Sequence, residues 1–268
     1  MTTPQPKISI LMPSFNQAPY LEMAIRSVLT QNYPNKELIL IDGGSTDGTV
    51  DIIKRYQSDL AYWVSESDRG QTHALNKALT HASGELIGWL NSDDYYLPGA
   101  FQRVVQAFEN HPEIGLIHGD RIMVDEKSRV LGWTTLPPFA PASTGFIVCS
   151  ETAFWRKSEG EKIQFDESLR FAMDLDFFCR LYRQSRFLKL DHYLGAFRCH
   201  AANKSSLISD VGRQETEALW KNIFPEFPDG WKKGPPANLP KSLLALVKNP
   251  LTITLPYLYR RLFIGSKK

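Results

Sequence analysis

Short apolar runs alternate with amphipathic segments over residues 8–108 of the chain. The apolar runs cover residues 8–12, 38–41, 60–64 and 86–90, and we expect each to form a buried strand. Apolar residues then recur at helical spacing in residues 21–29, 50–53, 75–82 and 101–108. Strands that alternate with helices are typical of parallel βαβ units, so the pattern predicts an α/β fold.

A polar cluster follows each of the four predicted strands. The clusters are residues 13–16, 42–45, 66–70 and 91–94. Parallel strands present their carboxyl ends at one edge of the sheet, and ligands bind at that edge in open α/β folds. We therefore expect the four clusters to form one binding site.

The alternation becomes irregular after residue 115. Further strands are predicted at residues 116–124, 130–133 and 193–199, and further helices at 175–182 and 211–223. Residues 230–240 contain several Gly and Pro residues and are predicted to form a linker. This irregular half indicates that the sheet is mixed.

The composition narrows the function mainly by exclusion. The chain has 268 residues and a formal net charge of +2, which gives no support to nucleic-acid binding. Its three cysteines form no CxxC pair, so a zinc or redox site is not indicated. The first residues lack the pattern of a signal peptide, and no apolar stretch reaches the ~20 residues of a membrane-spanning helix. We therefore expect a cytoplasmic protein.

Two adjacent carboxylates, Asp93 and Asp94, follow the fourth predicted strand. Mg²⁺ and Mn²⁺ prefer oxygen ligands and commonly bridge a protein carboxylate to substrate phosphates. The pair therefore indicates a metal site for a phosphorylated substrate. A simpler interpretation is that these aspartates cap the helix that follows.

Asp42 closes the second predicted strand, where a dinucleotide-binding fold places the acid that binds a ribose. That fold also needs a glycine fingerprint after the first strand, and residues 13–17 contain no glycine. A dehydrogenase is therefore not indicated. Asp42 can still contact a base or ribose while Thr46 or Asp47 caps the next helix.

Together these motifs resemble those of family 2 glycosyltransferases with the GT-A fold. The matching segments are residues 13–16, 27–31, 42–49, 68–70, 74–78, 90–94, 165–169, 173–176 and 197–200. The likeness covers most of residues 7–206. It implies a GT-A-like (Rossmann-like) α/β fold with a mixed, mainly parallel sheet flanked by helices and a C-terminal helical extension.

The resemblance also implies roles for single residues in donor binding. The residues implied to contact the nucleotide-sugar donor are Pro13, Ser14, Asn16, Asp42, Asp68, Arg69, Asn91, Ser92 and His200. Arg69 is equally compatible with a solvated loop charge, and a single histidine such as His200 is usually structural. Arg198, His200 and Lys204 also cluster in the sequence, and a diphosphate would suit such a group.

The implied metal is Mn²⁺ or Mg²⁺, held by Asp93, Asp94 and His200. Asp93 occupies the last position of the family's Asp-x-Asp motif, whose first position is Asn91 here, so one negative charge is lost. Gly43 and Met173 are two further departures, because many members carry an acid at each position.

Asp174 falls at the position of the family's catalytic base, although without the resemblance it would be interpreted as a helix N-cap. The implied reaction is transfer of a sugar from a nucleotide sugar, most simply a UDP-sugar, to a glycan or glycolipid hydroxyl. An acceptor hydroxyl needs a base to take its proton. A base opposite the departing diphosphate implies inversion at the anomeric carbon, and the setting resembles bacterial cell-surface polysaccharide assembly.

Three regions are expected on this basis. Residues 1–114 would bind the nucleotide sugar, residues 115–229 the acceptor, and residues 230–268 would form the C-terminal extension. The extension mixes apolar and aromatic residues with basic ones. It could lie on the inner face of the plasma membrane, or form a helix hairpin packed on the domain or on another subunit.

Two alternatives stay open from the sequence. A sugar nucleotidyltransferase would typically show a Gly- and Arg-rich loop with a lysine after the first strand, and none is present. A catalytically inactive carbohydrate- or nucleotide-binding relative is conceivable because of Asn91.

Overall fold

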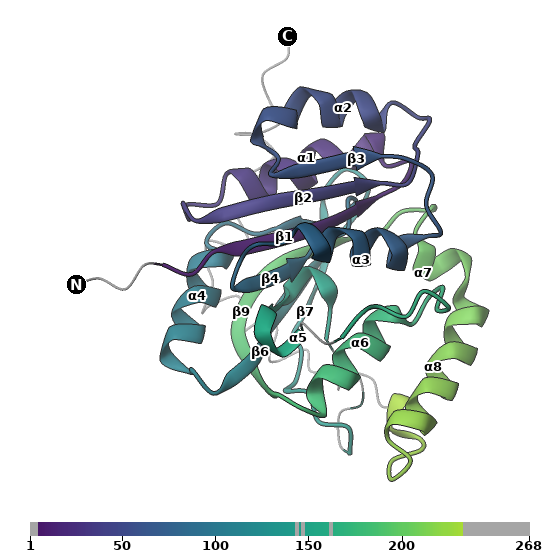
Figure 1. The fold of residues 1–268 in the computed structure, drawn as a ribbon. Helices are drawn as coiled ribbons and strands as arrows, with labels where there is room; N and C mark the ends of the chain where they lie inside the picture. The colour runs from purple at the N-terminus through teal and green to yellow at the C-terminus, as the bar shows by residue number, and fades with distance from the viewer. Residues whose placement is uncertain (1–4, 143–144, 146–147, 161–162, 233–268) are drawn as a thin grey trace.

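The computed structural model describes residues 5–142, 145, 148–160 and 163–232 (Figure 1). The strands are β1 (Ile8–Ser14), β2 (Lys36–Asp42), β3 (Tyr62–Ser65), β4 (Leu86–Trp89), β5 (Tyr95–Tyr96), β6 (Ile114–Val124), β7 (Val130–Thr134), β8 (Ala153–Arg156) and β9 (Arg186–Arg198). The helices are α1 (Ala18–Leu29), α2 (Thr49–Tyr56), α3 (Gln71–His81), α4 (Ala100–Asn110), α5 (Lys157–Gly160), α6 (Met173–Tyr182), α7 (Lys204–Leu207) and α8 (Ser209–Ile223).

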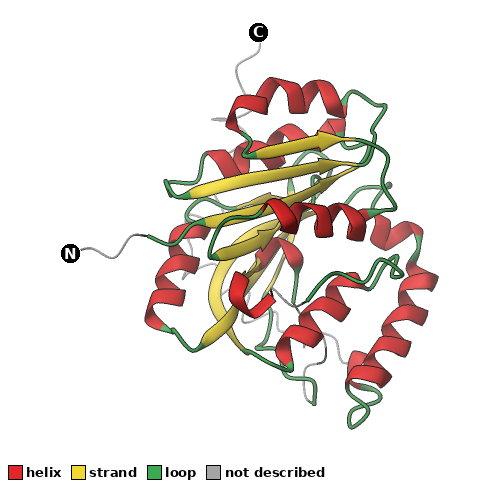
Figure 2. Cartoon of the chain, in the orientation of Figure 1, coloured by secondary structure: helices red, strands yellow, loops and turns green. Residues whose placement is uncertain are grey.

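All of these strands belong to one mixed sheet with the order β3–β2–β1–β4–β8–β6–β9–β5, and β7 pairs with β6 (Figure 2). The half built from β3, β2, β1 and β4 is parallel throughout. β8 then enters antiparallel between β4 and β6. β2 and β4 lie on opposite sides of β1, so the order in which strands are added to the sheet changes direction at β1. Such a change leaves a crevice at the carboxyl ends of these strands.

Helices cover both faces of the sheet, and alternate residues of the strands point to opposite faces. Ile10 and Met12 pack in one core with α1, α2 and α4, whereas Leu11 packs in a second core with α3, α6 and α8. This period of two explains why the central strands are continuous apolar runs: both of their faces are buried. Figure 1 shows α3 lying across β1 on the second face.

The turn between β2 and α2 also fixes the start of α1. Asp47 accepts hydrogen bonds from the backbone N–H groups of Ala18 (3.0 Å) and Thr49 (3.0 Å), the first residues of α1 and α2. Gly48, which follows, has φ +97°, a left-handed conformation that favours glycine. One carboxylate thus satisfies the open ends of two helices, as the predicted capping role of Asp47 requires.

The predicted mixed α/β fold is confirmed, and so are the four strand–helix units of the first half. Two strands were not predicted. β5 has only two residues, and β8 was missed because its apolar residues show neither a strand nor a helix period. β9 begins at Arg186, seven residues before the predicted strand, because its first half alternates polar and apolar residues at a part-buried edge.

The expected C-terminal extension lies almost wholly outside the described residues, which end at Lys232. Within the described ranges, no helix combines the length and the apolar character needed to cross a membrane. The three expected regions, residues 1–114, 115–229 and 230–268, therefore stay predictions. The first boundary falls at the start of β6, and the sheet continues across it.

We predict that Asp47→Ala lowers the free energy of unfolding by about 1–2 kcal/mol at pH 7, because two helix starts lose their acceptor. Burial alone would raise the pKa of Asp47, but the hydrogen bonds from Thr49 and Ala18 lower it. The stabilisation is therefore present at neutral pH and is lost as the pH falls through the pKa of the folded state.

Urea unfolding at pH 7 and in acid measures this difference. Asp59→Ala, which removes an exposed carboxylate from the turn before β3, is the matched control and should change stability by less than about 0.5 kcal/mol. Equal stability of Asp47→Ala and wild type at pH 7 would contradict the capping role.

Candidate active site

Two loops at the carboxyl edge of the sheet are bound to each other through Asn16. Its backbone N–H donates to Ser45 Oγ (2.7 Å), and its side-chain Oδ1 accepts from the N–H of Thr46 (2.9 Å). Asn16 has φ +52°, a left-handed conformation that asparagine tolerates better than most residues. Asn16 therefore fixes the shape of the edge where a nucleotide was expected.

Asp42 supports the same loop from inside the protein. It is fully buried, and its carboxylate accepts hydrogen bonds from the N–H of Gly44 (3.2 Å), the N–H of Ser45 (2.9 Å) and the hydroxyls of Ser45 (2.5 Å) and Ser65 (2.6 Å). Both carboxylate oxygens are used by protein donors. Asp42 therefore shapes the loop, and its contact with a base stays a prediction.

Pro13 and Ser14 end β1 next to this loop. Pro13 lies in register with Ile41, and both residues are buried. The hydroxyl of Ser14 is buried and has no hydrogen-bond partner among the described residues. Phe15, between Ser14 and Asn16, is 60% exposed. Phe15 is not among the predicted site residues.

The Asp68 carboxylate lies against the backbone at position 43. A Cβ atom at Gly43 would lie 2.9 Å from Asp68 Oδ2, which is closer than such atoms approach. The Asp68 carboxylate also accepts a hydrogen bond from the N–H of Gly70 (2.8 Å). Asp68 thus occupies the space that a side chain at position 43 would fill.

Arg69 is largely exposed and is paired within the protein. Its guanidinium contacts one carboxylate oxygen of Glu167 at 2.9 and 2.6 Å. Glu167 also accepts from the side-chain amide of Asn76 on α3 (3.3 Å). Arg69 therefore links the edge of the parallel half to the loop before α6, and its contact with a donor stays a prediction.

The amide of Asn91 is held by two protein donors. Its Oδ1 accepts from Trp89 Nε1 (2.9 Å) and from Gln71 Nε2 (2.7 Å). With both lone pairs used, this oxygen is not free to bind a cation, although the amide N–H₂ can still donate to a ligand. Ser92, the next residue, is buried.

Asp93 and His200 meet at the centre of the edge. His200 Nε2 lies 3.1 Å from Asp93 Oδ2, and the imidazole ring packs against Tyr20 with ring centroids 4.6 Å apart. The backbone N–H of His200 donates to Asn203 Oδ1 (2.5 Å). The structure therefore brings together two of the three predicted metal ligands.

Asp94 has different surroundings from its neighbour. It is 1% exposed, and its Oδ1 accepts a hydrogen bond from the backbone N–H of Arg198 in β9 (2.9 Å). Burial, together with the carboxylates of Asp93 and Glu151, raises the pKa of Asp94 well above its usual value. The Asp94 carboxyl thus joins the loop after β4 to β9 inside the protein, while its Oδ2 has no hydrogen-bond partner among the described residues. Its metal-binding role stays a prediction.

Arg198 is a buried clamp rather than a cation at the site surface. Its side chain is 2% exposed, and the guanidinium donates to the carbonyl oxygens of Asp93 (2.8 Å) and Asp125 (3.1 Å) and to Ser128 Oγ (2.9 Å). It also lies over the ring of Tyr20, 4.9 Å from the centroid. Arg198 therefore fixes the backbone of Asp93 and does not reach a diphosphate.

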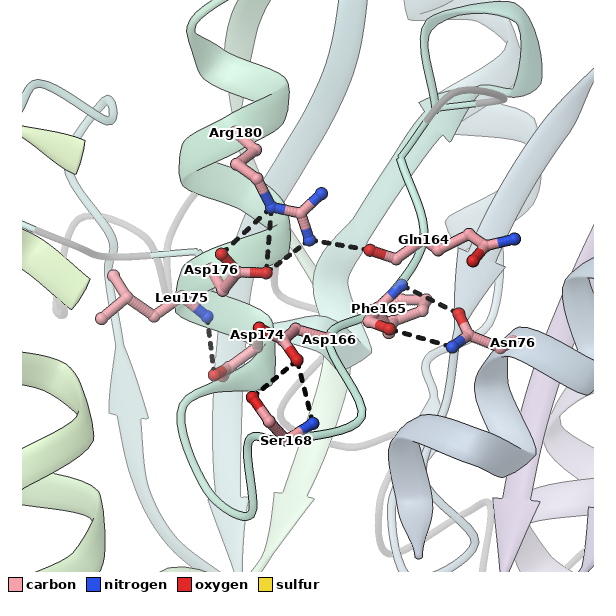
Figure 3. Close-up of polar contacts among 9 residues, drawn as sticks. All are labelled: Asn76, Gln164, Phe165, Asp166, Ser168, Asp174, Leu175, Asp176 and Arg180. Carbon is pink, nitrogen blue, oxygen red and sulfur yellow. Dashed lines mark hydrogen bonds and ion pairs between the residues drawn. The ribbon is translucent and has the colours of Figure 1, made fainter. Parts of the chain in front are cut away.

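Asp174 lies in the first turn of α6 and is partly exposed. Its Oδ1 accepts from the backbone N–H of Leu175 (2.8 Å), as Figure 3 shows. Burial raises the pKa of Asp174 to about 6; the Leu175 hydrogen bond and the Lys204 ammonium oppose this rise, and the Glu151 carboxylate adds to it. A carboxylate with such a pKa is well matched to accepting a proton near neutral pH.

The backbone just before α6 is held by a carboxylate from α8. The carboxylate of Glu215 on α8 accepts from the N–H groups of Arg170 (3.0 Å), Phe171 (2.9 Å) and Ala172 (2.9 Å). Ala172 is the residue at the helix N-cap position, so Asp174 lies in the first turn and not at the N-cap. Asp174 still accepts the N–H of Leu175, one of the groups that the first turn of a helix leaves open.

A chain of contacts connects the Asp93 edge with Asp174. Lys204 Nζ donates to Gln71 Oε1 (3.0 Å), and the amide of Gln71 donates in turn to Asn91. The Lys204 ammonium interacts electrostatically with Asp174. Glu151 acts on the pKa of both Asp94 and Asp174. The strand-end motif, residues 91–94, and Asp174 are thus linked through Gln71 of α3 and Lys204 of α7.

A separate hollow of about 530 Å³ lies on the other side of α6. It is lined by Asn76, Gln164, Phe165, Asp166, Glu167, Asp176 and Arg180. Figure 3 shows Asp176 turned toward Arg180, which it binds, whereas Asp174 bonds to the backbone at the helix start. Neither Asp93 nor Asp174 lines this hollow.

The arrangement fits a divalent cation that a ligand helps to hold. Among the described residues, no group of three or more His, Cys, Asp and Glu side chains is placed to bind a metal ion. Asp93 and His200 offer one carboxylate and one imidazole, and phosphate oxygens and water commonly complete such a coordination shell. The pair therefore suits Mn²⁺ or Mg²⁺ bound together with a diphosphate.

Comparisons with known proteins identify relatives of this chain. The sequence profile described as Glycosyl transferase family 2 matches residues 9–190. An uncharacterized glycosyltransferase of Nostoc sp. is 35% identical over 115 residues, which cover 42% of this chain and 36% of that protein. The matched region is thus just over a third of that relative's length.

Two solved structures share the fold. TarS of S. aureus in complex with UDP-GlcNAc has a TM-score of 0.67 and 21% identity, covering 90% of this chain and 80% of that one. The mannosyltransferase PcManGT of Pyrobaculum calidifontis in complex with GDP-Man and Mn²⁺ has a TM-score of 0.64 and 20% identity, covering 93% and 76%. The expected GT-A-like fold is confirmed.

We predict that Arg198→Met lowers the free energy of unfolding by about 3 kcal/mol, because several buried acceptors lose their donor. Arg213→Met is the matched control: Arg213 is exposed on α8 and contacts only Asp210 among the described ion pairs, at 3.7 Å. Urea unfolding of both variants checks the prediction. A change below about 0.5 kcal/mol for Arg198→Met would show that the guanidinium is not a clamp.

Proposed function

Because the chain belongs to glycosyl transferase family 2, we propose that it transfers a sugar from a nucleotide-sugar donor to a hydroxyl group with inversion at the anomeric carbon. The observation that carries this proposal is the pairing of Asp93 with His200 at the strand edge, together with a linked carboxylate, Asp174, whose pKa is about 6. The first group suits a diphosphate with its cation, and the second suits an acceptor hydroxyl.

The donor is proposed to be a UDP-sugar. A nucleotide sugar with another base is the alternative. TarS is solved with UDP-GlcNAc and PcManGT with GDP-Man, so the shared fold is compatible with either base. The nucleoside would lie along Ser14, Asn16 and Asp68. The exposed ring of Phe15, beside Asn16, supports this place for it.

Asp93 and His200 would hold Mn²⁺ or Mg²⁺ on the donor diphosphate. A bound cation supplies Lewis-acid stabilisation of the charge that develops on the leaving group. Arg198 contributes by fixing the backbone of Asp93, and Tyr20 by packing against the His200 ring. The protein thus presents both ligands in a fixed orientation before the donor binds.

Asp174 would act as the general base. The acceptor oxygen forms a bond to the anomeric carbon while the bond from that carbon to the diphosphate oxygen breaks, and the acceptor proton passes to the Asp174 carboxylate. Such a displacement has an oxocarbenium-like transition state, as in glycoside hydrolysis. Because the base acts on the face opposite the diphosphate, the configuration inverts.

The acceptor is proposed to be a glycan or glycolipid hydroxyl in bacterial polysaccharide or cell-envelope assembly. We place the reaction in the cytoplasm. A peripheral contact of residues 230–268 with the inner face of the plasma membrane would bring a lipid-linked acceptor close to the site. An inactive relative that only binds carbohydrate or nucleotide is the alternative. The pKa of Asp174, raised to about 6, argues against it, because such a carboxylate suits a proton acceptor.

We predict that Asp174→Asn lowers transfer at least 100-fold and leaves donor binding unchanged, because the variant cannot accept the acceptor proton. The wild-type rate should rise with pH through about 6, as Asp174 loses its proton. Donor consumption and the dissociation constant of UDP measure the two effects. Asp210→Asn, a 90% exposed side chain on α8, is the control. Near wild-type transfer by Asp174→Asn would refute the assignment.

We also predict that Asp93→Asn abolishes the Mn²⁺-dependent rise in melting temperature that wild type shows with UDP, since a ligand of the folded state stabilises by mass action. Asp94→Asn is the informative comparison. It removes a buried carboxyl, whose pKa burial raises well above its usual value, and leaves Asp93 and His200 in place, so the Mn²⁺ response should persist. Loss of the response in Asp94→Asn alone would make Asp94 the ligand instead.

A further inference from the structure

The strand-end motif of this chain carries less negative charge than a motif with two acids. Asn91 is neutral, and its Oδ1 is already used by Trp89 and Gln71. Asp93 is therefore the carboxylate that the proposed cation site offers, with the His200 imidazole beside it. A cation held this way has few protein charges around it, while a nucleoside diphosphate brings two or three negative charges of its own.

A cationic side chain lies next to the same motif. Lys204 Nζ is 3.0 Å from Gln71 Oε1, and the other end of that amide donates to Asn91 Oδ1 at 2.7 Å. The amide of Gln71 thus connects the Lys204 ammonium to Asn91, the residue that lacks a negative charge. Part of the Lys204 side chain is exposed, so a ligand can reach it.

The present surroundings of Lys204 leave it able to bind an anion. Burial lowers the pKa of Lys204, and the carboxylates of Asp174 and Glu215 oppose that shift. In the described structure its ammonium donates a hydrogen bond to a neutral amide oxygen, Gln71 Oε1. An ammonium gains more from a phosphate oxygen than from an amide oxygen, because charge-assisted hydrogen bonds are roughly twice as strong.

From this geometry we propose that Lys204 contacts the donor diphosphate and that Gln71 positions the Lys204 side chain. The Lys204 ammonium then neutralises part of the diphosphate charge, which the cation neutralises alone in a motif with two acids. This inference rests on the proposed function. As the bond from the anomeric carbon to the diphosphate breaks, its electron pair remains on the diphosphate oxygen, and Lys204 stabilises that charge. Lys204 is then a binding residue of the leaving group, and Gln71 a positioning residue.

Arg198 cannot fill this role, although it is close in the sequence. Its guanidinium is buried and already bound to backbone oxygens. Arg69 is paired with Glu167 on the far side of α3. Lys204 is therefore the cation that the described structure places beside Asn91.

The test measures the binding of UDP and UMP by titration calorimetry to full-length wild type and Lys204→Met, each in EDTA and in Mn²⁺. We expect Lys204→Met to weaken UDP binding in EDTA by about tenfold and UMP binding by less than twofold, because only UDP carries the second phosphate. With Mn²⁺ present the loss for UDP should be smaller. Lys204→Arg should keep most of the affinity, and Gln71→Leu should show an intermediate loss.

Lys221→Met is the matched control, since it removes one exposed lysine that pairs with Glu217 on α8, away from Gln71 and Asp174. It should bind UDP like wild type. Equal UDP affinity of Lys204→Met and wild type in EDTA would overturn the inference, and so would equal losses for UDP and UMP. If wild type binds neither UDP nor GDP with Mn²⁺, the proposed function itself fails.

Discussion

The candidate site depends on one buried guanidinium. Arg198 ends β9, and its side chain donates to the backbone of Asp93 and to the turn after β6, while Tyr20 of α1 packs on it. Its own backbone N–H binds Asp94. A buried charge is tolerated only when its donors are satisfied, so these partners must stay in place. That requirement holds Asp93 and His200 in a fixed relation.

The acidic residues of the site divide into those that build the edge and those that face a ligand. Asp42, Asp47 and Asp94 each accept hydrogen bonds from backbone N–H groups of loops, helix starts or a neighbouring strand. Both carboxylate oxygens of Asp42 and of Asp47 accept from protein donors. Asp93, Asp94 and Asp174 each have one oxygen in such a contact, and the second oxygen of Asp94 is buried without a partner among the described residues. Asp93 and Asp174 differ from Asp94 in being partly exposed.

Much of the fold follows from local patterns that the sequence displays. The four strand–helix units of the first half were predicted because their strands are buried on both faces and their helices have one apolar face. β5 and β8 were not, since two or four residues carry no period. Their place in the sheet depends on pairing with β9, β4 and β6, which is a non-local interaction.

The sequence predicted the site about as far as it predicted the fold. The sequence indicated which loops meet, and the family resemblance indicated Asp93, Asp174 and His200. It could not show that Asp42 and Asp94 are buried, because burial depends on strands distant in sequence. Gln71, Glu151 and Glu215 were missed for a related reason: their partners lie between 20 and 133 positions away, and no local motif marks such pairs.

The central claim is that Asp93 and His200 hold a cation on a diphosphate while Asp174 faces the same donor from across the sugar. Anomalous diffraction at the manganese absorption edge, from crystals grown with UDP and Mn²⁺, tests it most directly. We predict a peak about 2.2 Å from a carboxylate oxygen of Asp93, adjacent to His200 Nε2 and to the diphosphate, with Asp174 on the opposite wall. A peak held by Asn91 or Asp94, or a nucleotide bound away from this edge, would contradict the account.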